Sequence, residues 1–188
     1  MIRFLLLLLL GVPLLVMAHP SIETRIHDLD RAIEQAPLTP QLYLMRGQLY
    51  SSHGDESRAK QDFKSAQTLN DNAQVQVALG HHFLSSGDYQ QASDSFARAI
   101  RMNSGEARAW LGQAKAVAEL GLHDLVLLSY RTYFALEANP QPGYFAAAVR
   151  AIAPYDRAAA QRLLEEAIER LGPVPTLTEL AATLEIRR

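Results

Sequence analysis

Histidine is the residue type whose placement in this sequence points most directly to chemistry. Cleavage of the chain after Ala18 would leave His19 as a new N-terminus. A free α-amino group and its own imidazole can together chelate Cu(II), because imidazole is a good copper ligand. A tight site needs a second imidazole, and the remaining histidines have no ligand-like spacing to His19. A copper site at His19 therefore stays an alternative, and no other metal site and no cofactor is expected.

Sequence patterns of common catalytic sites are missing. The chain has no Gly-rich phosphate loop before a Lys, no His pair at metalloprotease spacing and no Gly-x-Ser-x-Gly. Glu165, Glu166 and Glu169 lie along one expected helix with basic neighbours, and Glu166 is four residues from Arg170. Such a pair is typical of a solvated helix face rather than of acid–base chemistry. We therefore expect a protein that is not an enzyme.

The composition is typical of a globular protein. Of the 188 residues, 48% are apolar and 20% are charged, the formal net charge is −2, and cysteine is absent. Nucleic-acid-binding proteins usually carry a basic stripe, so no nucleic-acid partner is expected. The absence of Cys excludes disulfides, thiolate metal sites and a lipid-modified N-terminal Cys.

Residues 1–18 have the layout of a secretory signal peptide. One positive charge, Arg3, precedes a long apolar run. The run ends with residues of small or moderate size up to Ala18, as a signal peptidase requires. The alternative is an uncleaved membrane anchor, which needs about 20 apolar residues. This run is shorter and is interrupted by Gly11 and Pro13. We therefore expect cleavage after Ala18 and a periplasmic or secreted chain with no membrane span.

The remainder of the chain reads as a row of short helices that contains an internal repeat. Apolar residues recur at spacings of three and four, and Gly, Asp, Asn or Pro interrupts them every dozen or so residues. Two segments share one spacing, in which a Gly is followed by an aromatic at +3, Gly at +7, Ala at +12, Phe at +16 and Ala at +19. The positions are Gly47, Tyr50, Gly54, Ala59, Phe63 and Ala66, then Gly80, Phe83, Gly87, Ala92, Phe96 and Ala99. This match indicates stacked helix pairs rather than a globule around one centre.

The shared spacing has a packing reason. Each leading Gly is expected to let the second helix of its pair approach closely, with Ala59 or Ala92 as the small residue that faces it. A Gly followed by Asp is then expected to end the first helix and to cap the second. These turns are Gly54-Asp55 and Gly87-Asp88.

This pattern resembles the tetratricopeptide repeat (TPR), a helix-turn-helix unit of 34 residues. Trp110 and Tyr144 fall on the early aromatic position of two further, more degenerate repeats. The resemblance implies an all-α superhelical solenoid of an exported bacterial type, with an α-α superhelix lacking a regular repeat as the alternative. The expected order is a half-repeat over 19–39, repeats over 40–72, 73–106, 107–140 and 141–172, and a capping helix over 173–188. The expected helices cover about 20–35, 40–53, 56–70, 73–86, 89–102, 106–120, 123–138, 142–153, 156–171 and 176–186.

The resemblance also implies a binding surface, because the first helix of each repeat lines the concave face of such a solenoid. The groove residues would be Gln41, Leu44, Gln48, Ser51, Gln74, Val77, His81, Leu84, Arg108, Leu111 and Lys115. Their amide and aliphatic side chains suit an extended peptide. The family's grip on a C-terminal carboxylate is not expected, because Leu44 and Gln48 occupy the first-repeat positions that would carry it.

The helix expected over 123–138 is apolar on every side of its helical wheel, which indicates burial all round. We expect the fourth repeat to cover it, with a partner or a homo-oligomer contact as the alternative. Taken together, the sequence predicts a non-enzymatic scaffold of the bacterial envelope that binds a protein or peptide partner in its groove. The alternative function is copper handling at His19.

Overall fold

The computed structural model describes residues 21–186, which form ten α-helices and no strand. Each helix begins and ends within two residues of the range expected from the sequence. The helices are α1 (Ile22–Gln35), α2 (Pro40–Ser52), α3 (Glu56–Leu69), α4 (Ala73–Ser85), α5 (Tyr89–Met102), α6 (Ala107–Glu119), α7 (His123–Leu136), α8 (Pro142–Ile152), α9 (Arg157–Leu171) and α10 (Pro175–Ile186).

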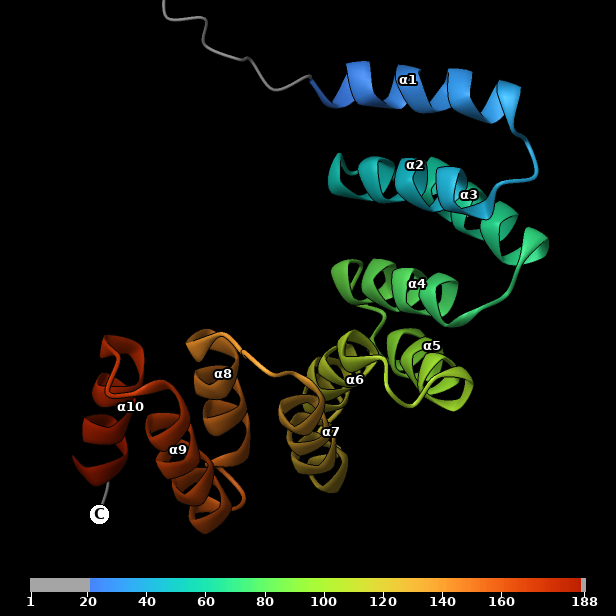
Figure 1. The fold of residues 1–188 in the computed structure, drawn as a ribbon. Coiled ribbons are helices and arrows are strands. Elements are labelled where there is room, and N and C mark those ends of the chain that lie inside the picture. Colours follow the sequence, from blue (N-terminus) through green and yellow to red (C-terminus); the bar gives the residue numbers. More distant parts are fainter. Residues whose placement is uncertain (1–20, 187–188) are drawn as a thin grey trace, which may run out of the picture.

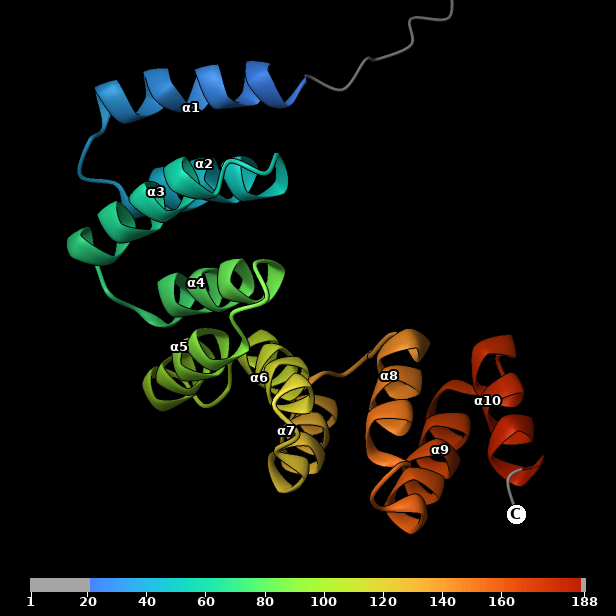
Figure 2. The ribbon, with the colours of Figure 1, turned by 180° about the vertical axis from the view of Figure 1, so that it is seen from behind.

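Four antiparallel helix pairs, α2–α3, α4–α5, α6–α7 and α8–α9, follow one another along a curved path (Figure 1). Helix α1 packs on α2 at one end, and α10 packs on α8 and α9 at the other. The view from behind shows the same crescent, with α1–α4 as one arm and α8–α10 as the second (Figure 2). The all-α solenoid expected from the sequence is confirmed.

The turns within the first two pairs have the geometry that the Gly-Asp dipeptides predict. Gly54 and Gly87 have positive φ values of 81° and 78°, a region that L side chains rarely adopt. The Asp55 carboxylate accepts from the Arg58 backbone N–H at 3.0 Å, and Asp88 accepts from that of Gln91 at 3.1 Å. Each dipeptide therefore ends one helix and caps the next.

The buried apolar side chains of the described residues form three clusters along the solenoid. One cluster joins α2, α3 and α4 around Phe63, and a second joins α4, α5 and α6 around Phe96. The third runs from α6 to α10 and includes Phe134 and Phe145, whose rings stack at 3.8 Å. A core divided in this way is typical of stacked repeats, in which each unit buries its apolar face against its neighbours.

The repeat glycines allow close approach, as predicted, and a phenylalanine ring of the second helix is nearest to each. A Cβ at Gly47 would lie 3.0 Å from the Phe63 ring, and one at Gly80 would lie 2.7 Å from the Phe96 ring. Ala59 and Ala92, which are expected to face these glycines, lie on the second helices of the same pairs and are fully buried. In each pair a flat aromatic ring thus lies against the bare backbone of the glycine.

Helix α7 is only half covered, so the expectation that the fourth repeat buries all of it is wrong. Tyr133 and Phe134 are buried because α8 packs against their side of the helix. The opposite side keeps large apolar side chains in solvent: Leu125, Leu128 and Leu136 of α7, with Leu122 just before the helix, are between 41% and 53% exposed. No helix within residues 21–186 has the length and apolar character needed to cross a membrane. The predicted signal peptide (1–18) and His19 lie outside the described residues.

Candidate peptide-binding groove

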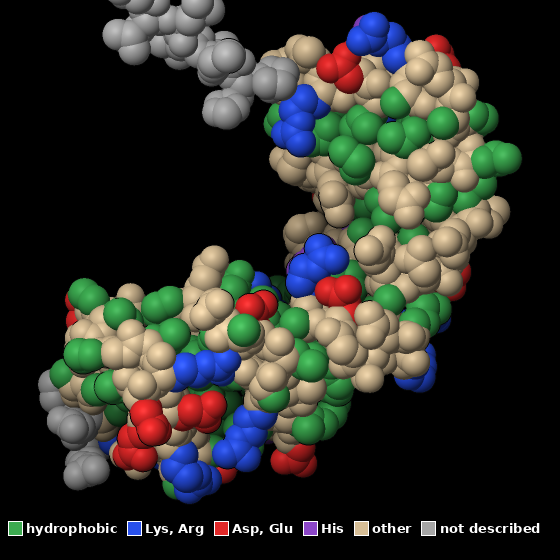
Figure 3. Space-filling view, in the orientation of Figure 1, with side chains coloured by type: hydrophobic (Ala, Val, Ile, Leu, Met, Phe, Trp, Pro, Cys, Tyr) green, Lys and Arg blue, Asp and Glu red, His purple; other side chains and the backbone are tan. Residues whose placement is uncertain are grey.

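A hollow of about 320 Å³ lies across the first helices of three successive pairs. Seven of the eleven predicted groove residues line it, namely Gln41, Leu44 and Gln48 on α2, Gln74, Val77 and His81 on α4, and Arg108 on α6. We call this surface the concave groove. In the space-filling view it lies within the notch between the two arms of the crescent (Figure 3).

The groove has an apolar floor and polar walls. Leu44 and Val77 are buried and form the floor. The glutamines at positions 41, 48 and 74 line the hollow beside this floor, and all three are exposed. Each amide can donate from its NH2 group and accept at its oxygen, so it can bind both polar groups of a peptide bond.

Local sequence explains why these side chains share one face. On α2 and on α4 the lining residues stand at positions i, i+3 and i+7, which lie on one side of an α-helix. The Asn72 side chain caps α4 by accepting from the Val75 backbone N–H at 3.1 Å, which sets the register of Gln74 and Val77. Gln41 and Gln48 are then about 10 Å apart along the axis of α2, close to the length of three residues of extended peptide.

The other four predicted groove residues do not line this hollow. The Oγ atom of Ser51 lies 3.3 Å from Nδ1 of the buried His82, and this contact joins α2 to α4. Leu84 packs on the core around Phe96, and Leu111 is buried in the cluster that runs to α10. The Lys115 ammonium lies 5.4 Å from the centre of the Tyr144 ring on α8. These side chains hold neighbouring repeats together instead of facing the hollow.

A second hollow, of about 490 Å³, adjoins the concave groove and was not predicted from the sequence. It lies between α1 and α2 and is lined by Arg25, Asp28, Leu29, Met45, Gln48 and Leu49. Met45 and Gln48 line both hollows, and the Met45 side chain is 51% exposed. The groove thus extends from α1 to α6. The sequence signal that could have revealed this extension is Met45, which directly follows the predicted groove residue Leu44. Flexible Met side chains are frequent at adaptable binding surfaces.

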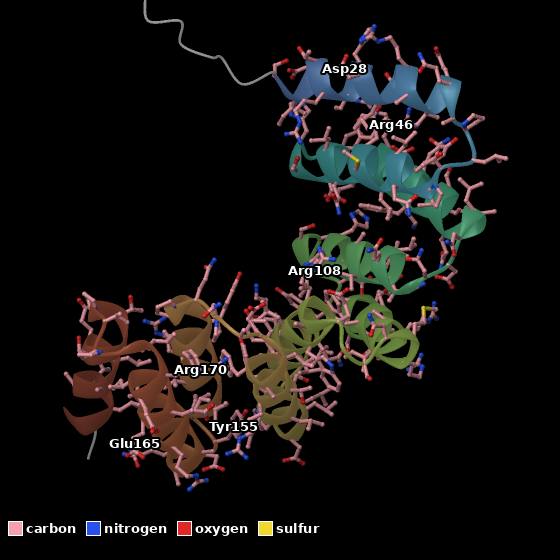
Figure 4. The ribbon with its side chains drawn as sticks, in the orientation of Figure 1. Asp28, Arg46, Arg108, Tyr155, Glu165 and Arg170 are labelled. Atoms are coloured by element: carbon pink, nitrogen blue, oxygen red, sulfur yellow. The ribbon has the colours of Figure 1, made fainter. Side chains whose placement is uncertain are left out.

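The α6 end of the groove carries one cationic side chain, that of Arg108, which is paired with Glu106. Burial lowers the pKa of His81 below its usual value, and the positive charges of Lys115 and Arg108 lower it further. His81 is exposed and lines the hollow, with its ring 5.2 Å from that of Phe96. The Arg108 side chain is 66% exposed and points into the notch, with its Nε 3.1 Å from Glu106 (Figure 4). A carboxylate on a bound peptide would be favoured at this end.

Partly buried ionic contacts hold the helices that carry the groove. The Arg46 guanidinium donates to Asp62 on α3 at 2.7 and 2.8 Å and to Asp30 on α1 at 2.6 Å. Its hydrogen bonds to Asp62 raise the pKa of Arg46 well above its usual value, with Asp30 adding to the rise. Because Arg46 is on α2, this one side chain fixes three helices relative to one another.

The acidic cluster of α9 has no catalytic geometry. The side chains of Glu165, Glu166 and Glu169 are exposed. The predicted pair of Glu166 with Arg170 is wrong, because Arg170 donates to the backbone oxygen of Phe134 at 2.8 Å and to those of Glu137 and Ala138. It thereby ties α9 to the end of α7. Throughout the part of the chain that the structure describes, no three His, Cys, Asp or Glu side chains are grouped so that they could hold a metal ion.

Comparison with known proteins agrees with this architecture. Residues 40–72 and 77–133 match tetratricopeptide repeat families. No curated protein sequence matches the chain at a significant level. The family matches cover α2–α3 and most of the segment from α4 to α7, which includes the helices that form the concave groove.

Several solved structures are similar to the chain. YrrB, described as a TPR protein with an unusual peptide-binding site, is 19% identical, with 86% of this chain and 84% of YrrB aligned and a TM-score of 0.67. TTC0263, a thermophilic TPR protein of Thermus thermophilus, is 18% identical over 88% of this chain and 91% of its own, with a TM-score of 0.66. MamA is 20% identical over 89% of this chain and 92% of its own, with a TM-score of 0.60. Residues 40–72 and 77–133 therefore match tetratricopeptide repeats, and the described residues share the fold of TPR solenoids.

Proposed function

We propose that this protein is a non-enzymatic scaffold that binds an extended peptide segment of a partner protein in the concave groove. The observation that carries the proposal is the convergence of three glutamines and the Arg108 guanidinium around an apolar floor. TPR solenoids are interaction scaffolds, and their curvature creates extended concave binding surfaces. YrrB, with a similar fold, is described as having a peptide-binding site.

The groove suits an extended chain better than a folded domain. In an extended peptide, successive side chains point to opposite sides, so alternate residues can rest on Leu44 and Val77. The peptide bonds between them are then level with the amides of Gln41, Gln48 and Gln74. An acidic residue of the peptide would lie toward Arg108. The arrangement contains no feature that requires a C-terminal carboxylate, so an internal segment fits equally well.

The location that we propose is the bacterial envelope or the exterior of the cell. This part of the proposal rests on the sequence of residues 1–18, whose basic start, apolar run and small residues before His19 are typical of a secretory signal peptide. The partner would then be an exported or envelope protein with an accessible extended segment. Fractionation of cells that express the untagged chain tests this location directly, and a cytoplasmic pool with an intact N-terminus would contradict it.

The function is tested by selection from a library of randomised decapeptides on the purified chain. Enriched peptides are then measured by fluorescence polarisation against the double variant Gln48→Ala/Gln74→Ala. Neither side chain is fully buried, so their truncation should not affect folding. The loss of two peptide-backbone contacts should weaken binding by about tenfold or more.

The matched control is the double variant Gln35→Ala/Gln61→Ala, because these glutamines are also exposed on helices but lie outside both hollows. Its affinity should equal that of the unmodified chain. Failure to enrich any peptide, or equal weakening by the two double variants, would contradict the proposed function.

A further inference from the structure

The outer side of α7 carries an unpartnered stripe of leucines. Leu128 is the most exposed of them at 53%, and Leu122, Leu125 and Leu136 are exposed by 41–44%. Leu125, Leu128 and Leu136 are spaced so that they follow one side of the helix. Large exposed apolar side chains that gather on one surface of a monomer mark interaction sites. We call these four side chains the leucine stripe.

Two opposite charges flank the leucine stripe. Asp124 and Arg131 are exposed and are seven residues apart, so that both lie on the same edge of the stripe, beside Leu128. Within residues 21–186 neither of them forms an ion pair. A surface with leucines in the centre and one charge of each sign along a single edge is complementary to itself.

We propose that the leucine stripe binds a second copy of this chain, with the two α7 helices antiparallel across a twofold axis. In this arrangement the charged edge of one α7 faces the charged edge of the other, and Asp124 of each copy lies level with Arg131 of the other. The twofold axis makes the contact isologous, so one pairing gives two ion pairs.

The same register brings the leucines together. When Asp124 is level with the second copy's Arg131, Leu125 lies within one helical turn of the second copy's Leu128. Leu122 likewise lies within one turn of the second copy's Leu136. One rigid placement therefore covers the stripe and neutralises both charges. A partner of unrelated sequence would need to reproduce this pattern of leucines and opposite charges, which the chain already supplies.

The contact is small and leaves the concave groove free. Four leucines per copy make an interface at the low end of those formed by specific complexes, so the dimer should be weak and should form at about 10 µM to 1 mM. Helix α6 lies between α7 and the groove (Figures 1 and 2). A dimer would therefore present two grooves to partners, and its existence does not depend on the proposed peptide binding.

Sedimentation equilibrium of the purified chain, from about 1 µM to about 1 mM, tests the proposal. The unmodified chain should show a monomer–dimer equilibrium, and Leu128→Lys should abolish it. Asp124→Arg and Arg131→Asp should each weaken the dimer by about tenfold, because each replaces two attractions with two repulsions. The double variant Asp124→Arg/Arg131→Asp restores opposite charges and should dimerise within about threefold of the unmodified chain.

The matched control is Glu165→Arg, a charge reversal on the exposed face of α9, away from the stripe (Figure 4). It should dimerise as the unmodified chain does, and circular dichroism should show that every variant keeps its helices. A chain that stays monomeric at about 1 mM would overturn the proposal. A dimer that survives Leu128→Lys, or a double variant that fails to recover, would also overturn it.

Discussion

Replacement of Gly112 by Ala would add one methyl group to a tightly packed contact between repeats. The Phe96 ring is fully buried between Gly80 on α4 and Gly112 on α6. A Cβ at Gly112 would lie 2.2 Å from Cζ and 2.3 Å from Cε1 of this ring, which is closer than real Cβ contacts. The ring cannot withdraw toward α4, because the contact there is already tight. The change must therefore move α6 away from α5 or distort the ring.

Two opposing terms set the size of the effect. Alanine inside a helix is favoured over glycine by about 0.5–1 kcal/mol. Overpacking of a filled core costs about 1–3 kcal/mol, and the short distances here put Gly112→Ala at the upper end. The free energy of unfolding should therefore fall by about 2 kcal/mol. In a chain of this length that corresponds to a midpoint lower by about 4–8 °C.

Thermal and urea unfolding followed by circular dichroism measures this change. The control is Gly143→Ala, because a Cβ at that position of α8 meets no atom within 4 Å. The control should be neutral or slightly stabilising. Gly47→Ala should fall between the two, since its Cβ would lie 3.0 Å from the Phe63 ring edge. If Gly112→Ala were as stable as Gly143→Ala, the packing of Phe96 between the two glycines would be refuted.

Two further predictions concern charged groups. Arg46→Met should lower the free energy of unfolding by about 2 kcal/mol or more, because it leaves Asp62 buried without its cation; urea unfolding equal to that of the unmodified chain would contradict this. His81 has a pKa below its usual value in the folded chain, so the unfolded chain takes up the proton first as the pH falls below about 6.5. Stability should therefore fall with acidification through this range. In the variant His81→Gln this loss of stability should be smaller. If the urea midpoint varied with pH equally in the variant and in the unmodified chain, His81 would not be a cause of the acid sensitivity.

The sequence predicts the helices and their pairing well, because each turn has a local cause. Gly54-Asp55 supplies both the positive φ that ends one helix and the cap that begins the next. Packing across repeats is harder to predict. Gly112 was missed because it stands outside the spacing shared by the first two repeats, although the Phe96 ring lies against it.

Of the expected groove positions, three on α2 and three on α4 line the hollow, whereas on α6 only Arg108 does. Arg108 faces the hollow, but Lys115, about two turns further along the same helix, turns toward Tyr144 because α8 packs beside it. The extension under α1 was missed because Arg25 and Asp28 belong to a helix outside the regular repeat. The exposure of Leu128 likewise depends on where α8 packs, and this cannot be read from the apolar pattern of α7 alone.

The central claim is that the groove from α1 to α6 holds an extended peptide. The most direct measurement is a crystal structure of the chain with a decapeptide enriched from the randomised library. We predict an extended peptide across α2 and α4, with its backbone hydrogen-bonded to Gln48 and Gln74 and a side chain resting on Val77. A peptide bound on the outer face of the crescent, or bound as a helix away from these residues, would contradict the account.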